Sequence, residues 1–371
     1  MTEGAPERRL PRETWVALDM AGCPNRCRHC YLGSPPTRRV EGAVLAGLAA
    51  RFRDWVRPGE CAPYLRHVQA YSWFREPDYR DDYRALYDLE GEVSGRAPQR
   101  FELLSIWRLA REPDYARWAR SIGTEVCQIS FFGLETTHDW FVRRRGAFRD
   151  SLLATERLLE AGIRPRWQLF LTRRILPEVG ELYGLVDRLR LRQRAEALGA
   201  PFQVFAHTPG PDGEAFLIEE LRPTVADLAR VPAELLEASV AHLGRPLGEA
   251  EGDIVARLRR CDEPVATRWG NTGPLGFYVT SGFDVYSNLA DLNPWWRLGN
   301  LAHDDVGDVV ARLEGAGAIG LQVLRDVPLS ALARRYGRPR GRRIYTEGDL
   351  VSRWVLLECR RRWTEPPSRR A

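Results

Sequence analysis

The sequence contains no lysine, so every one of its 55 strongly basic residues is an arginine. Complete replacement of one cation by the other is typical of a genome-wide base composition, not of a face selected for binding. The arginines are also interleaved with 50 acidic residues and do not form a block. The net charge of +5 therefore does not indicate a nucleic-acid surface, and we do not expect a nucleic-acid partner.

Long apolar runs are missing as well. No run reaches the roughly 18 residues that a membrane-spanning helix needs, so we expect no membrane partner. The opening stretch, MTEGAPERRLPRET, lacks the apolar region of a secretory signal, and we expect a cytoplasmic protein. The apolar fraction of 44% and the charged fraction of 28% are those of an ordinary globular protein.

From residue 14 to about residue 206, short β-rich runs alternate with amphipathic stretches of helical spacing. Such alternation indicates an α/β fold with a parallel sheet and right-handed crossovers. The repeats are too few for a closed eight-fold barrel, so we predict a partial (β/α)6 TIM-like barrel over residues 14–215. Ligands bind such sheets at the carboxyl ends of the strands. The predicted strands are residues 15–19, 66–71, 101–106, 126–131, 166–171 and 202–206.

Residues outside this alternation form two further predicted parts. Residues 1–13 are expected to be an N-terminal tail. Residues 216–371 are expected to be a smaller α+β extension, with a β-hairpin at about 277–286 (FYVTSGFDVY) and helices after it.

Seven cysteines are present, and an odd number argues against a disulfide framework. Three of them, Cys23, Cys27 and Cys30, lie within eight residues, just past the first predicted strand. Their C-x3-C-x2-C spacing favours an iron–sulfur cluster or zinc, because both metals prefer soft thiolates. A structural zinc site is normally closed by four ligands, and only His29 stands nearby as a fourth. The open position indicates that a cofactor or substrate completes the coordination.

The stretch CPNRCRHCY resembles the cluster loop of the radical S-adenosylmethionine (radical SAM) enzymes, whose pattern is C-x3-C-x-aromatic-C. The resemblance implies one [4Fe–4S] cluster on Cys23, Cys27 and Cys30, with S-adenosyl-L-methionine bound at the open iron. It also implies an external one-electron donor of the flavodoxin or ferredoxin type. One electron from the cluster would cleave the bound S-adenosylmethionine into a 5′-deoxyadenosyl radical. This radical would then remove hydrogen from a substrate. His29, in the aromatic position, and Tyr31 are implied to contact the cofactor.

The same resemblance implies a cofactor contact after the second strand. Phe74-Arg75-Glu76-Pro77 stands where the family has Gly-Gly-Glu-Pro. Glu76 is therefore implied to bind the ammonium group of the cofactor, since a carboxylate is a good partner for an ammonium. Arg75 replaces a glycine and opposes the close backbone approach that the family uses. Alternatively, Glu76 only stabilises the first turn of a helix.

Further cofactor residues are implied at the ends of later strands. QISFFGLETTHDWFVRRRGAF is similar to the family's S-x-D-G turn, with Phe132 in place of the usual aspartate. Ser130 is implied to bind the ribose or carboxylate of the cofactor. One of Arg143, Arg144 and Arg145 is implied to clamp the carboxylate by a fork contact, and Arg143 is the nearest in register. Alternatively, arginines 143–145 are a solvated charge run. Other candidates at strand ends, each with core packing as the alternative, are Gln168 and Phe205 for the cofactor and Trp73 and His207 for the substrate.

The C-terminal third is similar to the SPASM or twitch extension of peptide-modifying radical SAM enzymes. That extension binds auxiliary clusters through a G-x4-C step, whereas this chain has Ser287 in the cysteine position after Gly282. No C-x2-C follows, and Cys261 and Cys359 alone cannot hold a usual cluster. We therefore expect a degenerate extension without auxiliary metals, which favours redox-neutral reactions.

Three functions follow from these observations. The favoured one is a radical SAM enzyme that acts on a peptide or a small natural-product scaffold. The second is a non-catalytic iron–sulfur or SAM-binding partner protein on the same fold, which the altered Arg75 position favours. The third, a radical SAM enzyme that modifies nucleic acid, is favoured only by the net charge.

Overall fold

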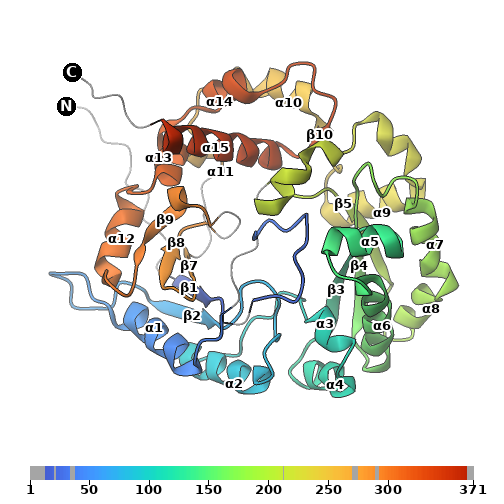
Figure 1. Ribbon diagram of the computed structural model, residues 1–371, viewed down its shortest axis with the longest axis horizontal. Coiled ribbons are helices and arrows are strands. Elements are labelled where there is room, and N and C mark those ends of the chain that lie inside the picture. Colours follow the sequence, from blue (N-terminus) through green and yellow to red (C-terminus); the bar gives the residue numbers. More distant parts are fainter. Residues whose placement is uncertain are drawn as a thin grey trace.

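The computed structural model describes residues 13–20, 22–33, 38–211, 213–269, 275–288 and 292–365, which form a mixed α/β fold. Two sheets that contain the parallel strands stand apart, with helices around them (Figure 1). The dark-blue chain that follows the first strand runs between the two sheets in this view. The α/β class predicted from the sequence is confirmed.

One sheet contains three parallel strands in the order β3-β4-β5. Their bounds are Val126–Phe131, Arg164–Phe170 and Gln203–His207. The residues of β3 and β4 alternate between buried and half-exposed, as expected for strands with one face against a core. Ile129, Trp167 and other buried residues pack against the crossover helices. These helices are α5 (Glu135–Val142), α6 (Ala147–Glu160), α7 (Val179–Arg188) and α8 (Leu191–Glu196).

The other sheet joins distant parts of the chain. Its order is β2-β1-β7-β8-β9, and β1 (Glu13–Leu18) is parallel to both of its neighbours. The Thr14 hydroxyl donates to the Leu275 carbonyl at 2.6 Å, across this β1–β7 pairing. The predicted N- and C-terminal parts thus share one sheet, while the division at residue 215 stays a prediction. The other strands are β2 (His67–Tyr71), β7 (Leu275–Val279), β8 (Asp284–Tyr286) and β9 (Arg297–Asn300).

The predicted strand at residues 101–106 is wrong. Phe101 and Glu102 have φ angles of 52° and 57°, in the left-handed region that a strand excludes. Ser105 then caps the short helix α3 (Ile106–Leu109) by accepting a bond from the Arg108 N–H. Among the described residues, β2 and β3 do not pair, so the six predicted strands do not form one sheet. The barrel arrangement itself stays a prediction.

The remaining elements surround these sheets. No helix in the described ranges is long and apolar enough to cross a membrane. In the N-terminal half these elements are α1 (Gly42–Asp54), α2 (Tyr83–Ser94) and α4 (Pro113–Ser121). After β5 they are η1 (Gly213–Leu221), η2 (Ala226–Arg230), α9 (Ala233–Leu243), β6 (Glu249–Ala250), α10 (Glu251–Leu258), α11 (Val265–Trp269), η3 (Pro294–Trp296), α12 (Val306–Glu314), α13 (Ile319–Asp326), α14 (Leu329–Tyr336), β10 (Ile344–Tyr345) and α15 (Glu347–Thr364).

A buried carboxyl group ties α2 to the end of β2. Glu90 is 1% exposed, and its Oε1 accepts from the Ser72 N–H at 2.6 Å and from the Ser72 hydroxyl at 2.5 Å. Burial raises the pKa of Glu90 from its ordinary 4.5 to about 7, although both Ser72 bonds oppose the rise. The folded state therefore binds more protons than the unfolded state between these values. Stability falls as the pH rises through this window.

Replacing Glu90 by glutamine is expected to reduce the loss of stability between pH 5 and pH 8. Glutamine keeps the acceptor oxygen for Ser72 and cannot ionise. The raised pKa of Glu90 corresponds to on the order of 3 kcal/mol of pH-dependent stability. Urea unfolding at both pH values measures the difference between wild type and Glu90→Gln. Identical pH slopes for the two proteins would contradict the prediction.

Candidate functional site

The cysteine loop, residues 22–33, follows β1 and is fixed by backbone bonds to two other segments. Arg26 N–H and Arg28 N–H donate to Val142 O (3.2 Å) and Phe141 O (2.7 Å) at the end of α5. On the other side, Glu214 N–H in η1 donates to Cys30 O at 2.9 Å. The loop therefore has a defined position between the two sheets.

The three thiols of this loop interact electrostatically. Burial raises the pKa of Cys23, Cys27 and Cys30, and the negative charge of a neighbouring thiolate adds to the rise for Cys23 and Cys27. In the described part of the chain, no group of three or more His, Cys, Asp or Glu side chains is arranged around a single metal ion. A four-iron cluster is held differently, with one thiolate on each iron. Three soft thiolates on one tight loop fit such a cluster, with one iron left open.

Glu76 lies against the cysteine loop, as the resemblance implied. Its Oε2 is 3.8 Å from Cys23 Sγ, and its Oε1 accepts from the Ser105 hydroxyl at 2.7 Å. Burial raises the pKa of Glu76 to about 7, while the bonds from Ser105 and from the Trp107 N–H act in the opposite direction. A carboxyl group in this state favours a nearby cation strongly. Glu76 is not itself in the first turn of a helix, because α2 begins only at Tyr83, but its bond from the Trp107 N–H is made with the first turn of α3.

The turn that carries Glu76 is followed by a buried polar network that fixes its backbone. Asp78 has a left-handed φ of 55° and is 7% exposed. Its carboxylate accepts from the Tyr115 hydroxyl at 2.5 Å, and its carbonyl accepts from Arg108 Nε at 2.6 Å. Arg108 is itself 1% exposed. These bonds fix the backbone two residues beyond Glu76.

Arg75 stands where the family motif has glycine, and its side chain is buried in an ion pair. Its Nη2 forms an ion pair with Asp19 Oδ2 at 2.8 Å, and the two side chains are 7% and 9% exposed. Asp19 Oδ1 also accepts from the Gly22 N–H at 3.1 Å. Asp19 therefore connects the Arg75 turn to the first residue of the cysteine loop.

Three predicted cofactor residues lie side by side on the sheet formed by β3, β4 and β5. Ser130, Gln168 and Phe205 are register partners across β3, β4 and β5. The Ser130 hydroxyl donates to Gln168 Oε1 at 2.8 Å, and Gln128 Nε2 donates to the same oxygen at 3.1 Å. Their face of the sheet also carries Phe170, two residues after Gln168. This arrangement provides polar groups beside an aromatic surface.

His29 packs onto that aromatic surface. Its ring is 4.0 Å from the Phe132 ring and 5.0 Å from the Phe170 ring, centre to centre. Burial lowers the pKa of His29 to about 3, so the imidazole is neutral. His29, in the aromatic position of the family pattern, and Phe132, in place of the family's aspartate, thus contact each other. An apolar contact between the loop and β3 results.

Arg143 and Arg144 have different partners, and Arg144 also pairs through Nη1 with Asp150 at 2.5 Å. Arg143 ends α5 with a left-handed φ of 57° and pairs with Glu214 at 3.4 Å. Arg144 instead donates through Nε to Asn25 Oδ1 at 2.6 Å, within the cysteine loop. Its positive charge lowers the pKa of both Cys27 and Glu76. Arg143 was the favoured candidate of the three for the carboxylate clamp, and Arg144 is bonded to the cysteine loop.

The two substrate candidates lie in different surroundings. His207, at the end of β5, has its ring 5.6 Å from Phe170, so it belongs to the group of rings that contacts His29. Its Nδ1 is buried and has no hydrogen-bond partner in the described ranges. Trp73 packs near Tyr71 and Phe101, at ring distances of 6.0 and 6.3 Å. The structure thus brings His207, but not Trp73, into the ring group that contacts His29.

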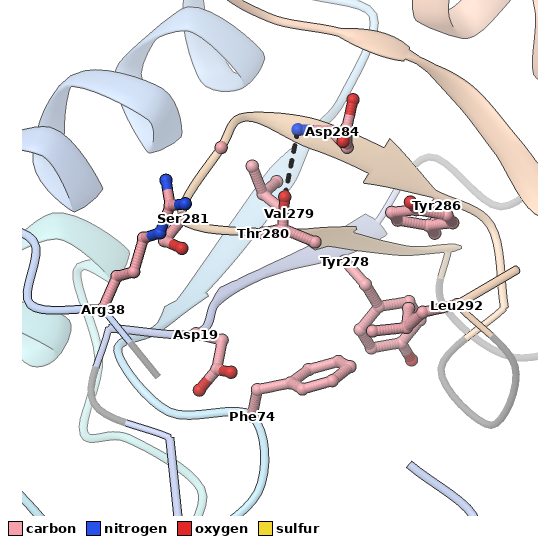
Figure 2. Close-up of a pocket in the computed structure, with 11 residues that line it drawn as sticks. Asp19, Arg38, Phe74, Tyr278, Val279, Thr280, Ser281, Asp284, Tyr286 and Leu292 are labelled. Carbon is pink, nitrogen blue, oxygen red and sulfur yellow. Dashed lines mark hydrogen bonds between the residues drawn. The ribbon is translucent and has the colours of Figure 1, made fainter. Parts of the chain in front are cut away.

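A cavity of about 360 Å³ opens at the carboxyl ends of β1 and β7 (Figure 2). The sequence analysis missed it, because its walls come from strands that pair across more than 250 residues. The signal that could have indicated it is the aromatic hairpin FYVTSGFDVY, which supplies several of the lining residues. Its lining residues are Asp19, Arg38, Phe74, Tyr278, Val279, Thr280, Ser281, Gly282, Asp284, Tyr286 and Leu292.

The fold of this chain is shared with solved structures that hold S-adenosylmethionine (AdoMet). Native anSMEcpe with bound AdoMet matches with a TM-score of 0.50 and 12% identity, over 95% of this chain and 98% of that chain. The same protein with AdoMet and the Cp18Cys peptide gives the same values. Streptococcus suis SuiB bound to precursor peptide SuiA matches with a TM-score of 0.47 and 13% identity, over 90% of this chain and 75% of that chain.

At such identities the likeness concerns the fold alone. No protein-family model matches the sequence, and no curated protein matches it either. The chemistry must therefore be argued from the cysteine loop and its neighbours.

Proposed function

We propose that this chain is a radical SAM enzyme with a partial TIM-like barrel and a degenerate SPASM-like extension. The observation that carries the proposal is the placement of Cys23, Cys27 and Cys30 on one anchored loop against the buried Glu76. A [4Fe–4S] cluster and S-adenosyl-L-methionine, when bound there, supply a 5′-deoxyadenosyl radical that removes hydrogen from a substrate. The protein's part is to bind, orient and seal this chemistry.

Glu76 binds the ammonium group of the cofactor in this proposal. Its Oε1 is already held by Ser105, while its Oε2 faces the cysteine loop. A cation beside it stabilises the ionised form and returns the pKa of Glu76 toward its ordinary range. Arg143 and Arg144 are the cationic candidates for the cofactor carboxylate, and Arg144 also pairs with Asp150.

The β3-β4-β5 sheet supplies the remaining cofactor contacts. Ser130 and Gln168 offer hydroxyl and amide groups to the ribose, and Phe205 in the next strand contributes apolar surface. His29 keeps water from the loop by packing on Phe132 and Phe170. Tyr31 follows the last cysteine and stays a cofactor candidate.

The extension is proposed to cover the substrate without metals of its own. Ser287, in the position of the family's auxiliary-cluster cysteine, bonds to Trp296 O through its N–H (3.2 Å) and through its hydroxyl (3.3 Å). Both bonds join β8 to η3, a structural role. A peptide substrate is supported by the peptide bound to the neighbouring fold of anSMEcpe. The electron donor is proposed to be a flavodoxin or ferredoxin.

Anaerobic reconstitution of the wild-type chain tests the proposal. We expect about four irons per chain and release of 5′-deoxyadenosine from S-adenosylmethionine under dithionite. The measurements are iron and sulfide assays and chromatography of the nucleoside. A chain that binds no iron refutes the proposal.

The buried Arg75–Asp19 pair favours a second function, a non-catalytic partner protein that binds the cluster and S-adenosylmethionine. The same experiment separates the two functions. Iron and cofactor binding without release of 5′-deoxyadenosine would establish the non-catalytic protein. A radical SAM enzyme that modifies nucleic acid would release the nucleoside and bind RNA or DNA in addition.

A further inference from the structure

The cavity at the ends of β1 and β7 has apolar walls on one side. Phe74, Tyr278 and Tyr286 are each less than 10% exposed, and Leu292 completes this side. The rings of Phe74 and Tyr278 are 5.6 Å apart. Arg38 and Ser281 lie on the other side, as Figure 2 shows. A volume of about 360 Å³ is near the lower end for small-ligand sites, so the cavity suits one side chain and not a length of peptide.

The carboxylates that line the cavity already have partners. Asp19 pairs with Arg75 at 2.8 Å. Asp284 Oδ1 accepts from Arg297 Nε at 2.8 Å and from Asn300 Nδ2 at 2.9 Å. Each carboxylate is therefore already paired with a guanidinium, which weakens its attraction for a cationic ligand. Arg38 is solvent-exposed and, within the described ranges, no carboxylate pairs with it. The charge left for a ligand is positive.

One hydrogen bond connects this cavity to the cysteine loop. Asp19, which lines the cavity, accepts from Gly22 N–H at the start of the loop. The Tyr278 hydroxyl passes over Gly276, where a Cβ atom would come within 2.8 Å of it, so glycine at this position leaves room for the Tyr278 side chain. The cavity thus adjoins the site at which the proposed radical forms.

We propose that this cavity binds an uncharged apolar side chain of a substrate peptide, with a carboxylate of the same peptide meeting Arg38. The inference rests on the proposed function and names the substrate class of that site: peptides with an aromatic or large aliphatic residue next to an acidic one. Peptides with a basic residue in that place are disfavoured by the positive charge of Arg38. The hydrogen that is removed belongs to this apolar residue or to its neighbour.

Peptide binding to the reconstituted full chain, with S-adenosylmethionine and without reductant, tests the inference. The probe is acetylated and amidated Gly-Glu-Phe-Glu-Gly, and calorimetry gives its Kd. Replacing Phe by Ala is expected to weaken binding by about tenfold or more, since one large apolar side chain leaves the cavity. Replacing both Glu by Gln is expected to weaken it about threefold, and replacing both by Lys weakens it further.

Arg38→Gln and Arg39→Gln form a matched pair, because both arginines are exposed and only Arg38 lines the cavity. Arg38→Gln is expected to weaken the Glu peptide about threefold and to leave the Gln peptide unchanged. Arg39→Gln should change neither peptide. The inference is overturned if the Lys peptide binds as tightly as the Glu peptide, if Phe→Ala has no effect, or if no peptide binds.

The proposed function is tested separately by release of 5′-deoxyadenosine from the wild-type chain without any peptide. Release of the nucleoside together with one of the overturning peptide results refutes the inference alone. Loss of iron and of nucleoside release refutes the proposed function, whatever the peptides do.

Discussion

Replacing Cys23, Cys27 and Cys30 together by alanine is expected to leave the reconstituted chain without iron and without release of 5′-deoxyadenosine. The three thiols are the only cysteines on the anchored loop, and a cluster cannot be held there by His29, whose ring packs on Phe132. We expect iron to fall from about four per chain to background. Iron and sulfide assays, with the absorbance of the cluster, measure the loss.

A double variant, Cys61→Ala with Cys261→Ala, is the matched control. Cys61 is exposed and Cys261 is half-buried, and neither lies on the loop. The control should keep wild-type iron and nucleoside release, which shows that removal of cysteine as such has no effect. Circular dichroism of the triple variant checks that the fold is retained. A folded triple variant that keeps its iron would show that the cluster is held elsewhere.

Gly213→Ala is expected to lower the iron content several-fold and to destabilise the chain by about 2–4 kcal/mol. Gly213 has a left-handed φ of +55°, and a Cβ atom there would lie 2.7 Å from Cys30 O and still closer to Tyr31 O. These contacts are with backbone atoms, which cannot rotate away. The segment must therefore shift, and the bond from Glu214 N–H to Cys30 O is lost with it.

Gly210→Ala is the control for this substitution. A Cβ atom at Gly210 meets no atom within 4 Å, so its stability and iron content should equal those of the wild type. Iron per chain after reconstitution with limiting iron, and the urea midpoint, give the comparison. Equal results for the two alanine variants would mean that η1 does not support the loop.

Local patterns in the sequence predicted the strands β3, β4 and β5 and the turn that carries Glu76. The run from Val126 to Phe131 was predicted to the residue, because its alternation reflects one buried face. The run at 101–106 is equally apolar, yet Phe101 and Glu102 adopt left-handed backbone conformations. Nothing in a short apolar run reports such a φ angle, since tertiary contacts decide it.

The candidate site shows the same division. The cysteine spacing and Glu76 are local features, and the structure brings them together. The pairing of β1 with β7 is not local, and the cavity that depends on it could not be predicted. The choice among arginines 143–145 stays a prediction. The left-handed conformation of Arg143 changes the direction of the chain at the end of α5, so counting residues along a regular helix does not identify the arginine that faces the loop.

The position of β1 between β2 and β7 also determines when this sheet can be completed during synthesis of the chain. When a ribosome has released β1 and β2, one edge of β1 still exposes its unpaired peptide groups until residues 275–279 emerge. At roughly 5–20 residues per second, that interval is on the order of ten seconds to a minute. The cysteine loop leaves the carboxyl end of this unfinished strand. The proposed cluster site is therefore complete only after about three quarters of the chain have been synthesised.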